Sequence, residues 1–159
     1  MGQIVMQFAG SDSFTSQAIQ WFDHGEYAHV DTVMPDGLLL GARNDVMAGF
    51  PAGVQLRAAD YQQGYTLKRV TLPCSDDQQK AYYDFVLAQV GKPYDSKAIA
   101  AFVVGRDWRT PDAWFCSELC AAGLEASGVV PPLSASCNKI APDDLLLVLS
   151  ALTDITSPA

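Results

Sequence analysis

The chain has 159 residues, 49% of them apolar and 18% charged, and a formal net charge of −8. These values predict a single domain over residues 1–159 and exclude a disordered chain. Because nucleic acids and anionic lipid headgroups are also negatively charged, neither is an expected partner. No apolar run reaches the roughly twenty residues of a membrane span. The opening segment MGQIVMQFAG lacks the basic start and the length of a signal peptide, so we expect a cytoplasmic protein.

Short alternating apolar segments dominate the first half of the chain and predict strands. The expected strands cover 3–10, 28–34, 38–43, 53–61 and 65–72. Pro35-Asp36-Gly37 supplies turn residues that join the second and third strands into a hairpin. One capped helix is expected early in the chain, over 11–22.

Helical spacing of apolar residues dominates the second half. A serine cap followed by acidic residues opens a helix over 75–91, which stops at Gly91. A turn leads into an apolar helix within 91–105, and helices with proline at the first helical position are expected over 110–128 and 141–152. Strands followed by helices predict an α+β fold, in which a short antiparallel sheet packs against helices.

Cys116 is the first candidate functional residue, because it lies near the start of the helix predicted over 110–128. Unpaired N–H groups and the helix dipole favour an anion there, and so favour the thiolate, the nucleophilic form of cysteine. The same N–H groups can stabilise an oxyanion. A cysteine considered alone is more often buried packing, and that alternative stays open.

A thiol nucleophile needs a base within hydrogen-bond reach, and the chain has two histidines. His29 lies in the strand predicted over 28–34, where a rigid backbone can hold an imidazole against a helix N-terminus. His24 lies in a loop and is expected at the rim of the site. We therefore predict that Cys116 and His29 touch across a cleft open to solvent. A structural role for His29 is the alternative.

Three segments in order, EYAHVDTVMPDGLLLGA, GKPYD and WFCSELC, resemble the circularly permuted branch of the NlpC-type papain-like cysteine hydrolases. That group contains YiiX-like proteins and, more remotely, lecithin:retinol acyltransferase, and a bacterial or phage origin would suit the resemblance. The matching motifs span residues 27–120. The resemblance implies a papain-like fold with Cys116 as nucleophile and His29 as base. It also implies that Tyr94 lines the substrate or oxyanion site and that the N–H of Ser117 binds the oxyanion.

The residue that orients the imidazole in this family lies twelve positions after the histidine, and here that position is Gly41. Glycine has no polar side chain, so the sequence departs from the family pattern. Asp31 is a candidate substitute, because it follows His29 by two residues and projects from the same face of the strand. An exposed strand aspartate is the equal alternative, and Asn44 is a weaker candidate for the third residue.

Cys120 lies one helical turn after Cys116. We expect it in the core, with a resolving thiol that responds to oxidation as the alternative. A zinc site built from these two cysteines and the two histidines is disfavoured, because the spacings match no common pattern. The sequence therefore predicts neither a metal nor a cofactor.

Together these residues predict a cysteine hydrolase or acyltransferase that cleaves an amide or ester bond through a thioester. The resemblance implies a peptidoglycan peptide or a lipid-derived acyl group as the substrate. The competing interpretation is an inactive binding or structural module that retains the fold, and Gly41 favours it. The sequence does not indicate an oligomeric state.

Overall fold

The computed structural model describes residues 1–10, 25–97, 112–133, 136–153 and 155–156. The helix predicted over 11–22 lies outside these ranges, and so do His24 and most of the apolar helix predicted within 91–105.

A six-stranded antiparallel sheet forms one layer of the fold and has the strand order β4-β3-β2-β1-β5-β6. β1 (Gly2–Gly10) is central and pairs with β2 (His29–Val33) on one side and β5 (Thr66–Cys74) on the other. The sheet continues beyond these with β3 (Leu39–Arg43), β4 (Gly53–Arg57) and the short β6 (Ile155–Thr156).

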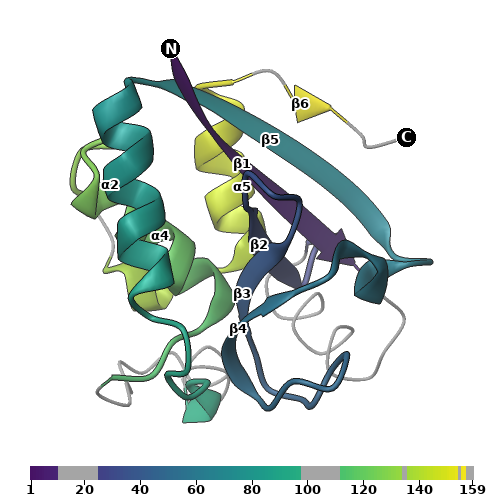
Figure 1. The fold of residues 1–159 in the computed structure, drawn as a ribbon. Coiled ribbons are helices and arrows are strands. Elements are labelled where there is room, and N and C mark those ends of the chain that lie inside the picture. The colour runs from purple at the N-terminus through teal and green to yellow at the C-terminus, as the bar shows by residue number, and fades with distance from the viewer. Residues whose placement is uncertain (11–24, 98–111, 134–135, 154, 157–159) are drawn as a thin grey trace.

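The second layer is helical and packs against one side of this sheet (Figure 1). Its α-helices within the described ranges are α2 (Asp76–Leu87), α4 (Cys116–Ala126) and α5 (Pro142–Ser150), and the 3-10 helices are η1 (Ala59–Gln62) and η2 (Cys137–Lys139). α2 contacts β1, α4 contacts β2 and β3, and α5 contacts β5. The predicted α+β class is therefore confirmed, and the helix that carries Cys116 faces the strand that carries His29.

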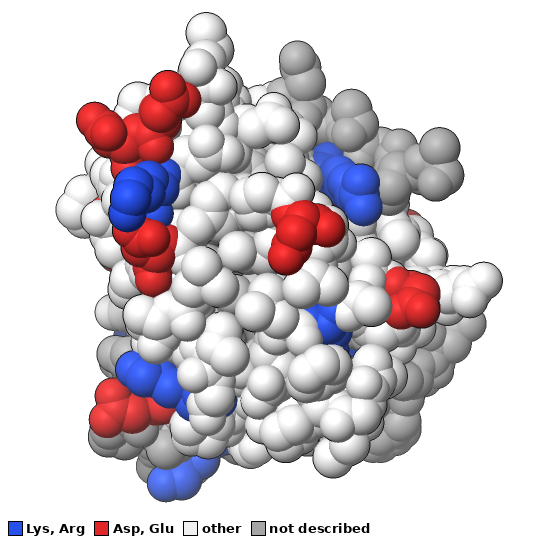
Figure 2. Space-filling view, in the orientation of Figure 1, with Lys and Arg blue, Asp and Glu red and all other residues white. Residues whose placement is uncertain are grey.

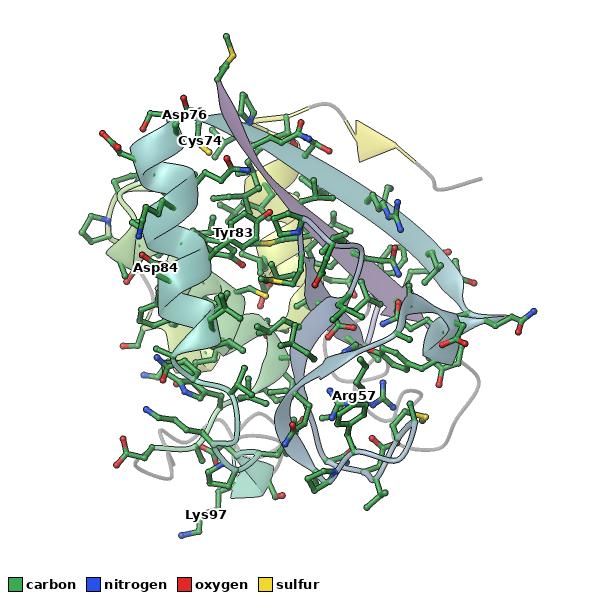
Figure 3. All side chains as sticks on the ribbon, in the orientation of Figure 1. Arg57, Cys74, Asp76, Tyr83, Asp84 and Lys97 are labelled. Carbon is green, nitrogen blue, oxygen red and sulfur yellow. The ribbon has the colours of Figure 1, made fainter. Side chains whose placement is uncertain are left out.

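The core lies between the two layers. Alternate residues of β1 point into it, and Ile4, Met6 and Phe8 are all 0% exposed. α2 and α4 approach closely at Gly123, where an added Cβ would lie 2.8 Å from the Tyr82 ring. Tyr83 points from α2 toward the sheet (Figure 3) and donates its hydroxyl hydrogen to the Val33 carbonyl at 3.3 Å.

Two of the element boundaries that differ from the sequence predictions are the ends of β4 and α2. The strand predicted over 53–61 ends at Arg57, and the chain then turns into η1. The helix predicted over 75–91 ends at Leu87, and turns follow as far as Gly91, which has a φ of 89°. Both corrections arise because hydrophobic pattern alone does not show where a backbone leaves its regular path.

Charged side chains of both signs are dispersed over the face in Figure 2, and the described residues on that face form no basic patch. Within the described part of the chain, no helix combines the length and the apolar character that a membrane crossing requires.

Candidate active site

A parallel bridge between residues 93–95 and Trp114 fixes the start of α4. The Trp114 N–H donates to the Pro93 carbonyl and the Asp95 N–H donates to the Trp114 carbonyl, both at 3.0 Å. Because these backbone groups hold Trp114 in an extended conformation, the helix predicted over 110–128 is interrupted at residues 112–115, and Thr110 lies outside the described residues. Phe115 is the N-cap and Cys116 is the first helical residue. The segments GKPYD and WFCSELC are therefore neighbours in space.

The same GKPYD segment is anchored to β4. The Val54 N–H donates to the Lys92 carbonyl at 2.9 Å, and the Gly91 N–H donates to the Val54 carbonyl at 2.8 Å. Gly53 permits this approach, because it has a φ of 116° and a Cβ there would lie 2.4 Å from the Lys92 oxygen.

Tyr94 is consequently held beside the start of α4, with its ring centroid 5.9 Å from that of Phe115. Burial raises the pKa of the Tyr94 hydroxyl well above its ordinary value, and the charge of Cys116 raises it further. The hydroxyl therefore remains protonated near neutral pH and can act as a hydrogen-bond donor. Its electrostatic coupling to Cys116 agrees with the predicted position of Tyr94 beside the cysteine.

His29 links the strand to the helix. Its Nε2 lies 2.8 Å from Asp31 Oδ1, and the two side chains are 12% and 1% exposed. Burial lowers the pKa of His29, but the charge and hydrogen bond of Asp31, together with a hydrogen bond to Cys116, raise the pKa overall to about 9. Because Nε2 faces Asp31, Nδ1 is the nitrogen left for the sulfur. The structure thus brings together the three predicted residues Cys116, His29 and Asp31.

Asp31 fills the space that the glycine at position 41 leaves open. A Cβ at Gly41 would lie 1.8 Å from Asp31 Oδ1. Asp31 is 0% exposed, so the alternative of an exposed strand aspartate is wrong. Burial raises the pKa of Asp31, but the charge and hydrogen bond of His29 and a hydrogen bond from Tyr61 lower it overall, so the group is a carboxylate. The weaker candidate Asn44 is exposed.

Tyr61 and Gln62, both in η1, complete the surroundings of Asp31 and were missed by sequence analysis. The Tyr61 hydroxyl donates to Asp31 Oδ2 and lies 3.2 Å from His29 Nε2. Gln62 donates through Nε2 to Asp31 Oδ2 at 2.7 Å. The sequence signal that could have located them is the polar run Tyr61-Gln62-Gln63 before the turn residue Gly64. Such a run is not typical of a continuing strand.

Two arginines lie beside the polar cluster formed by His29, Asp31, Tyr61 and Gln62. The guanidinium carbon of Arg43 lies 5.2 Å from the centre of the Tyr61 ring, and its nitrogens contact Asp45 at 2.8 and 3.0 Å. Arg57, on β4 (Figure 3), is 1% exposed and donates to the Gly41 carbonyl at 3.2 Å. Arg43 favours the charged form of Asp31, because its positive charge helps to lower the pKa of that carboxyl group.

Ser117 contributes its side chain to the fold. Its hydroxyl donates to the Ile140 carbonyl at 2.5 Å, and the residue is 0% exposed. The backbone N–H of Ser117 lies in the first turn of α4, where a helix provides no internal acceptor. The oxyanion donor predicted at Ser117 is this backbone N–H. The Ser117 hydroxyl is not a candidate, because it is bonded to the Ile140 carbonyl.

Cys120 lies in the core, which was the favoured prediction. It is 0% exposed, and its sulfur lies 3.8 Å from the Thr32 hydroxyl. Burial raises the pKa of Cys120 to about 12, so its thiol stays protonated near neutral pH.

The sulfur of Cys116 is less accessible than predicted. Cys116 is 1% exposed and belongs to a buried cluster with Phe115 and Leu119, so it does not face an open cleft. The side chain of His29, at 12% exposed, is the more accessible member of the pair. The correction follows from the bridge at Trp114, which draws the aromatic residues before Cys116 into the core.

Fold and site together define an α+β domain in which the partly exposed His29 lies between the buried Cys116 and Asp31. No family model and no curated protein sequence matches the chain. Its fold is similar to that of YiiX, a metalloprotein of Escherichia coli O157:H7 described as DUF1105, with a TM-score of 0.56 and 19% sequence identity. The similarity covers 98% of this chain and 87% of the other. It shows a YiiX-like fold.

Proposed function

We propose that the protein is a cysteine hydrolase or acyltransferase of the permuted NlpC-type, papain-like kind. The observation that carries the proposal is the bonding of His29, which has Asp31 on Nε2 and Cys116 as its other partner. A thiol, an imidazole and a buried carboxylate in this order form the arrangement required for nucleophilic acyl transfer. We propose two substrate classes, a peptide amide and a lipid-derived acyl group.

In the first step, His29 takes the proton of Cys116 and the sulfur attacks the carbonyl carbon of an amide or ester. The oxyanion receives hydrogen bonds from N–H groups in the first turn of α4 and from the protonated hydroxyl of Tyr94. The C–N or C–O bond then breaks, and His29 returns its proton to the leaving amine or alcohol. The product of this step is a thioester on Cys116.

In the second step, water or another acceptor gives a proton to His29 and attacks the thioester. The C–S bond breaks, the acyl group leaves as an acid or a new ester or amide, and the proton returns to sulfur. Asp31 keeps Nε2 hydrogen-bonded throughout and stabilises the imidazolium. These steps use no redox change and no cofactor.

The name of the structural neighbour raises a metal-dependent alternative. Among the residues that the structure describes, no three His, Cys, Asp or Glu side chains are grouped as metal ligands. The described side chains therefore do not fit a metal centre, and the proposed reaction derives no step from one.

Thiol alkylation with iodoacetamide tests the proposal. Cys74, beside Asp76 at the junction of β5 and α2 (Figure 3), and Cys137 are partly buried and are changed to serine in the test protein. We expect Cys116 to react rapidly at pH 6.5, because transfer of its proton to His29, the first step proposed above, generates the nucleophilic sulfur. His29→Ala should slow this reaction at least about tenfold, whereas His24→Ala, the matched control, should not.

Turnover is tested with an activated acyl ester. Cys116 should form a covalent adduct that hydroxylamine releases, as expected for a thioester, and Cys116→Ala should form none. Reaction of Cys116 only above about pH 8, at the same rate with and without His29, would overturn the proposal.

The 1% exposure of Cys116 favours the second candidate, an inactive module with the same fold. That candidate predicts slow alkylation at every pH and no acyl adduct. Binding without turnover would then be the function, and both measurements above separate it from the enzyme.

A further inference from the structure

A row of polar residues crosses the sheet behind the candidate site. Gln7 on β1 is paired directly with Asp31 on β2 and with Arg69 on β5. Directly paired residues of antiparallel strands project from the same face, so the three side chains are aligned across the sheet. Gln7 is 1% exposed, although it is polar and lies in a central strand.

Hydrogen bonds connect this row through Gln62. Arg69 Nε donates to Gln7 Oε1 at 2.7 Å, and Gln7 Nε2 donates to Gln62 Oε1 at 2.6 Å. Gln62 Nε2 in turn donates to Asp31 Oδ2 at 2.7 Å. The chain is continuous from a partly buried cation to the carboxylate that bonds His29.

The donor and acceptor groups of these side chains allow the chain of hydrogen bonds to run in only one direction. The Arg69 guanidinium donates hydrogen bonds and accepts none. Gln7 must therefore turn its oxygen to Arg69 and its amide hydrogens to Gln62. Gln62 must then turn its oxygen to Gln7 and its amide hydrogens to Asp31. Either amide rotated by half a turn would place two donors or two acceptors face to face.

We propose that Arg69, Gln7 and Gln62 are positioning residues, whose directed hydrogen bonds keep Asp31 an acceptor and so hold the imidazole of His29 toward Cys116. The inference rests on the proposed function for its catalytic meaning. The chain acts through Asp31 and has no contact with the substrate. A purely structural role, in which the bonds only join β1, β5 and η1, is the alternative that the experiment must separate.

Gln7→Glu replaces the Gln7 amide by a carboxylate and so reverses the hydrogen bond between residues 7 and 62. The new carboxylate accepts from Arg69 but has no donor for Gln62, so the Gln62 amide turns its hydrogens to that carboxylate and its oxygen to Asp31. Repulsion between the two oxygens loosens Asp31 and its hold on His29. The added negative charge by itself would act in the opposite sense, because an anion near His29 favours the imidazolium.

The readout is the titration of His29 followed by NMR in a His24→Gln background, which leaves one imidazole because the chain has two histidines. We expect the midpoint to fall by about one unit or more in Gln7→Glu, from the value of about 9 toward 6.5. Gln3→Glu is the matched control, since Gln3 is an exposed residue on the same face of β1. It should leave the midpoint within a few tenths of a unit of the unaltered protein.

An unchanged or raised midpoint in Gln7→Glu would overturn the inference, because only the charge effect would then remain. If that variant does not fold, Arg69→Met replaces it and should also lower the midpoint, while Arg69→Lys, which retains a cationic donor, should restore it. Equal midpoints in Arg69→Met and Arg69→Lys would likewise contradict a directed chain.

The same variants separate this inference from the proposed function. Alkylation of Cys116 at pH 6.5 should fall about tenfold in Gln7→Glu if the thiol depends on His29. A lowered His29 midpoint in a protein whose Cys116 never reacts would refute the enzyme and keep the positioning chain. A reactive Cys116 together with an unaltered His29 midpoint would support the enzyme and refute the positioning chain.

Discussion

The absence of a side chain at position 41 lets a carboxylate of the preceding strand reach the imidazole. Asp31 Oδ1 occupies the place where a Cβ of residue 41 would lie, at a separation of 1.8 Å. Asp31, which bonds His29, and Gly41, which makes room for Asp31, therefore depend on each other. Each should be damaging to replace alone, and exchange of the two should be tolerated.

We predict this exchange as follows. Gly41→Asp alone displaces Asp31 and should slow alkylation of Cys116 at pH 6.5 at least about tenfold, and Asp31→Gly alone should do the same by removing the carboxylate. The double variant Asp31→Gly/Gly41→Asp places a carboxylate on β3 with the space that it needs, and it should recover most of the rate. A double variant as slow as the product of the two single effects would show that positions 31 and 41 are independent.

Element boundaries set by tertiary contacts explain most of what the sequence did not reveal. The hydrophobic period was sufficient to predict β1, β2, β3, α2 and α5. The motifs selected Cys116 and His29, whose catalytic roles stay predictions. Thr110-Pro111 carries the usual signals of a helix start, but the bridge from Trp114 to the GKPYD segment moves the start to Cys116. Long-range pairing of this kind has no local pattern.

The partners of Asp31 escaped prediction for a related reason. Gln7, Asp31 and Arg69 are neighbours only through the register of β2, β1 and β5, which side-chain alternation alone does not specify. Tyr61 enters the site because the chain leaves β4 at Arg57 and turns into η1. The assignment of a papain-like fold from the motifs stays a prediction.

The contact between β4 and the GKPYD segment gives a prediction at the level of the element. Gly53→Ala imposes both an unfavourable positive φ and a clash with the Lys92 carbonyl, whereas Gly64→Ala imposes only the positive φ, since nothing lies within 4 Å of its Cβ. We expect a loss of about 1–2 kcal/mol in the free energy of unfolding for Gly64→Ala and a larger loss for Gly53→Ala. Urea unfolding measures both, and equal losses would show that the Lys92 contact is unimportant.

Only Gly53→Ala should also alter the site. Displacement of the 91–95 segment moves Tyr94 away from the start of α4, so labelling of Cys116 by the acyl ester should fall in that variant. Gly64→Ala should retain the labelling of the unaltered protein after correction for the folded fraction.

Over the whole molecule, the ion pair at His29 makes the free energy of unfolding depend on pH. The pKa of His29 is about 9 in the folded protein and about 6.5 in an unfolded chain, so the folded state binds the proton more tightly. The stabilisation is complete below pH 6.5 and disappears as the pH rises through 9. An acidic pH below the ordinary range of Asp31 should also remove it, because the pKa of that carboxyl is lowered by folding.

We therefore expect His29→Gln to cost more stability at pH 6 than at pH 9.5, with a difference on the order of 2–3 kcal/mol. Urea unfolding of both proteins at the two pH values gives the comparison, in which titrations common to both cancel. His24→Gln serves as the control and should show no such difference. A cost that is the same at both pH values would contradict a raised pKa for His29.

The pairing of glycine at position 41 with Asp31 also affects how proteins with a similar site are detected from sequence. A search template that demands an amide, acid or imidazole on the strand after the histidine would reject this chain. A template that instead accepts glycine there, provided an aspartate follows the histidine by two residues, would retain it. Glycine at that position and an aspartate two residues after the histidine form the compensating pair that such a template would recognise.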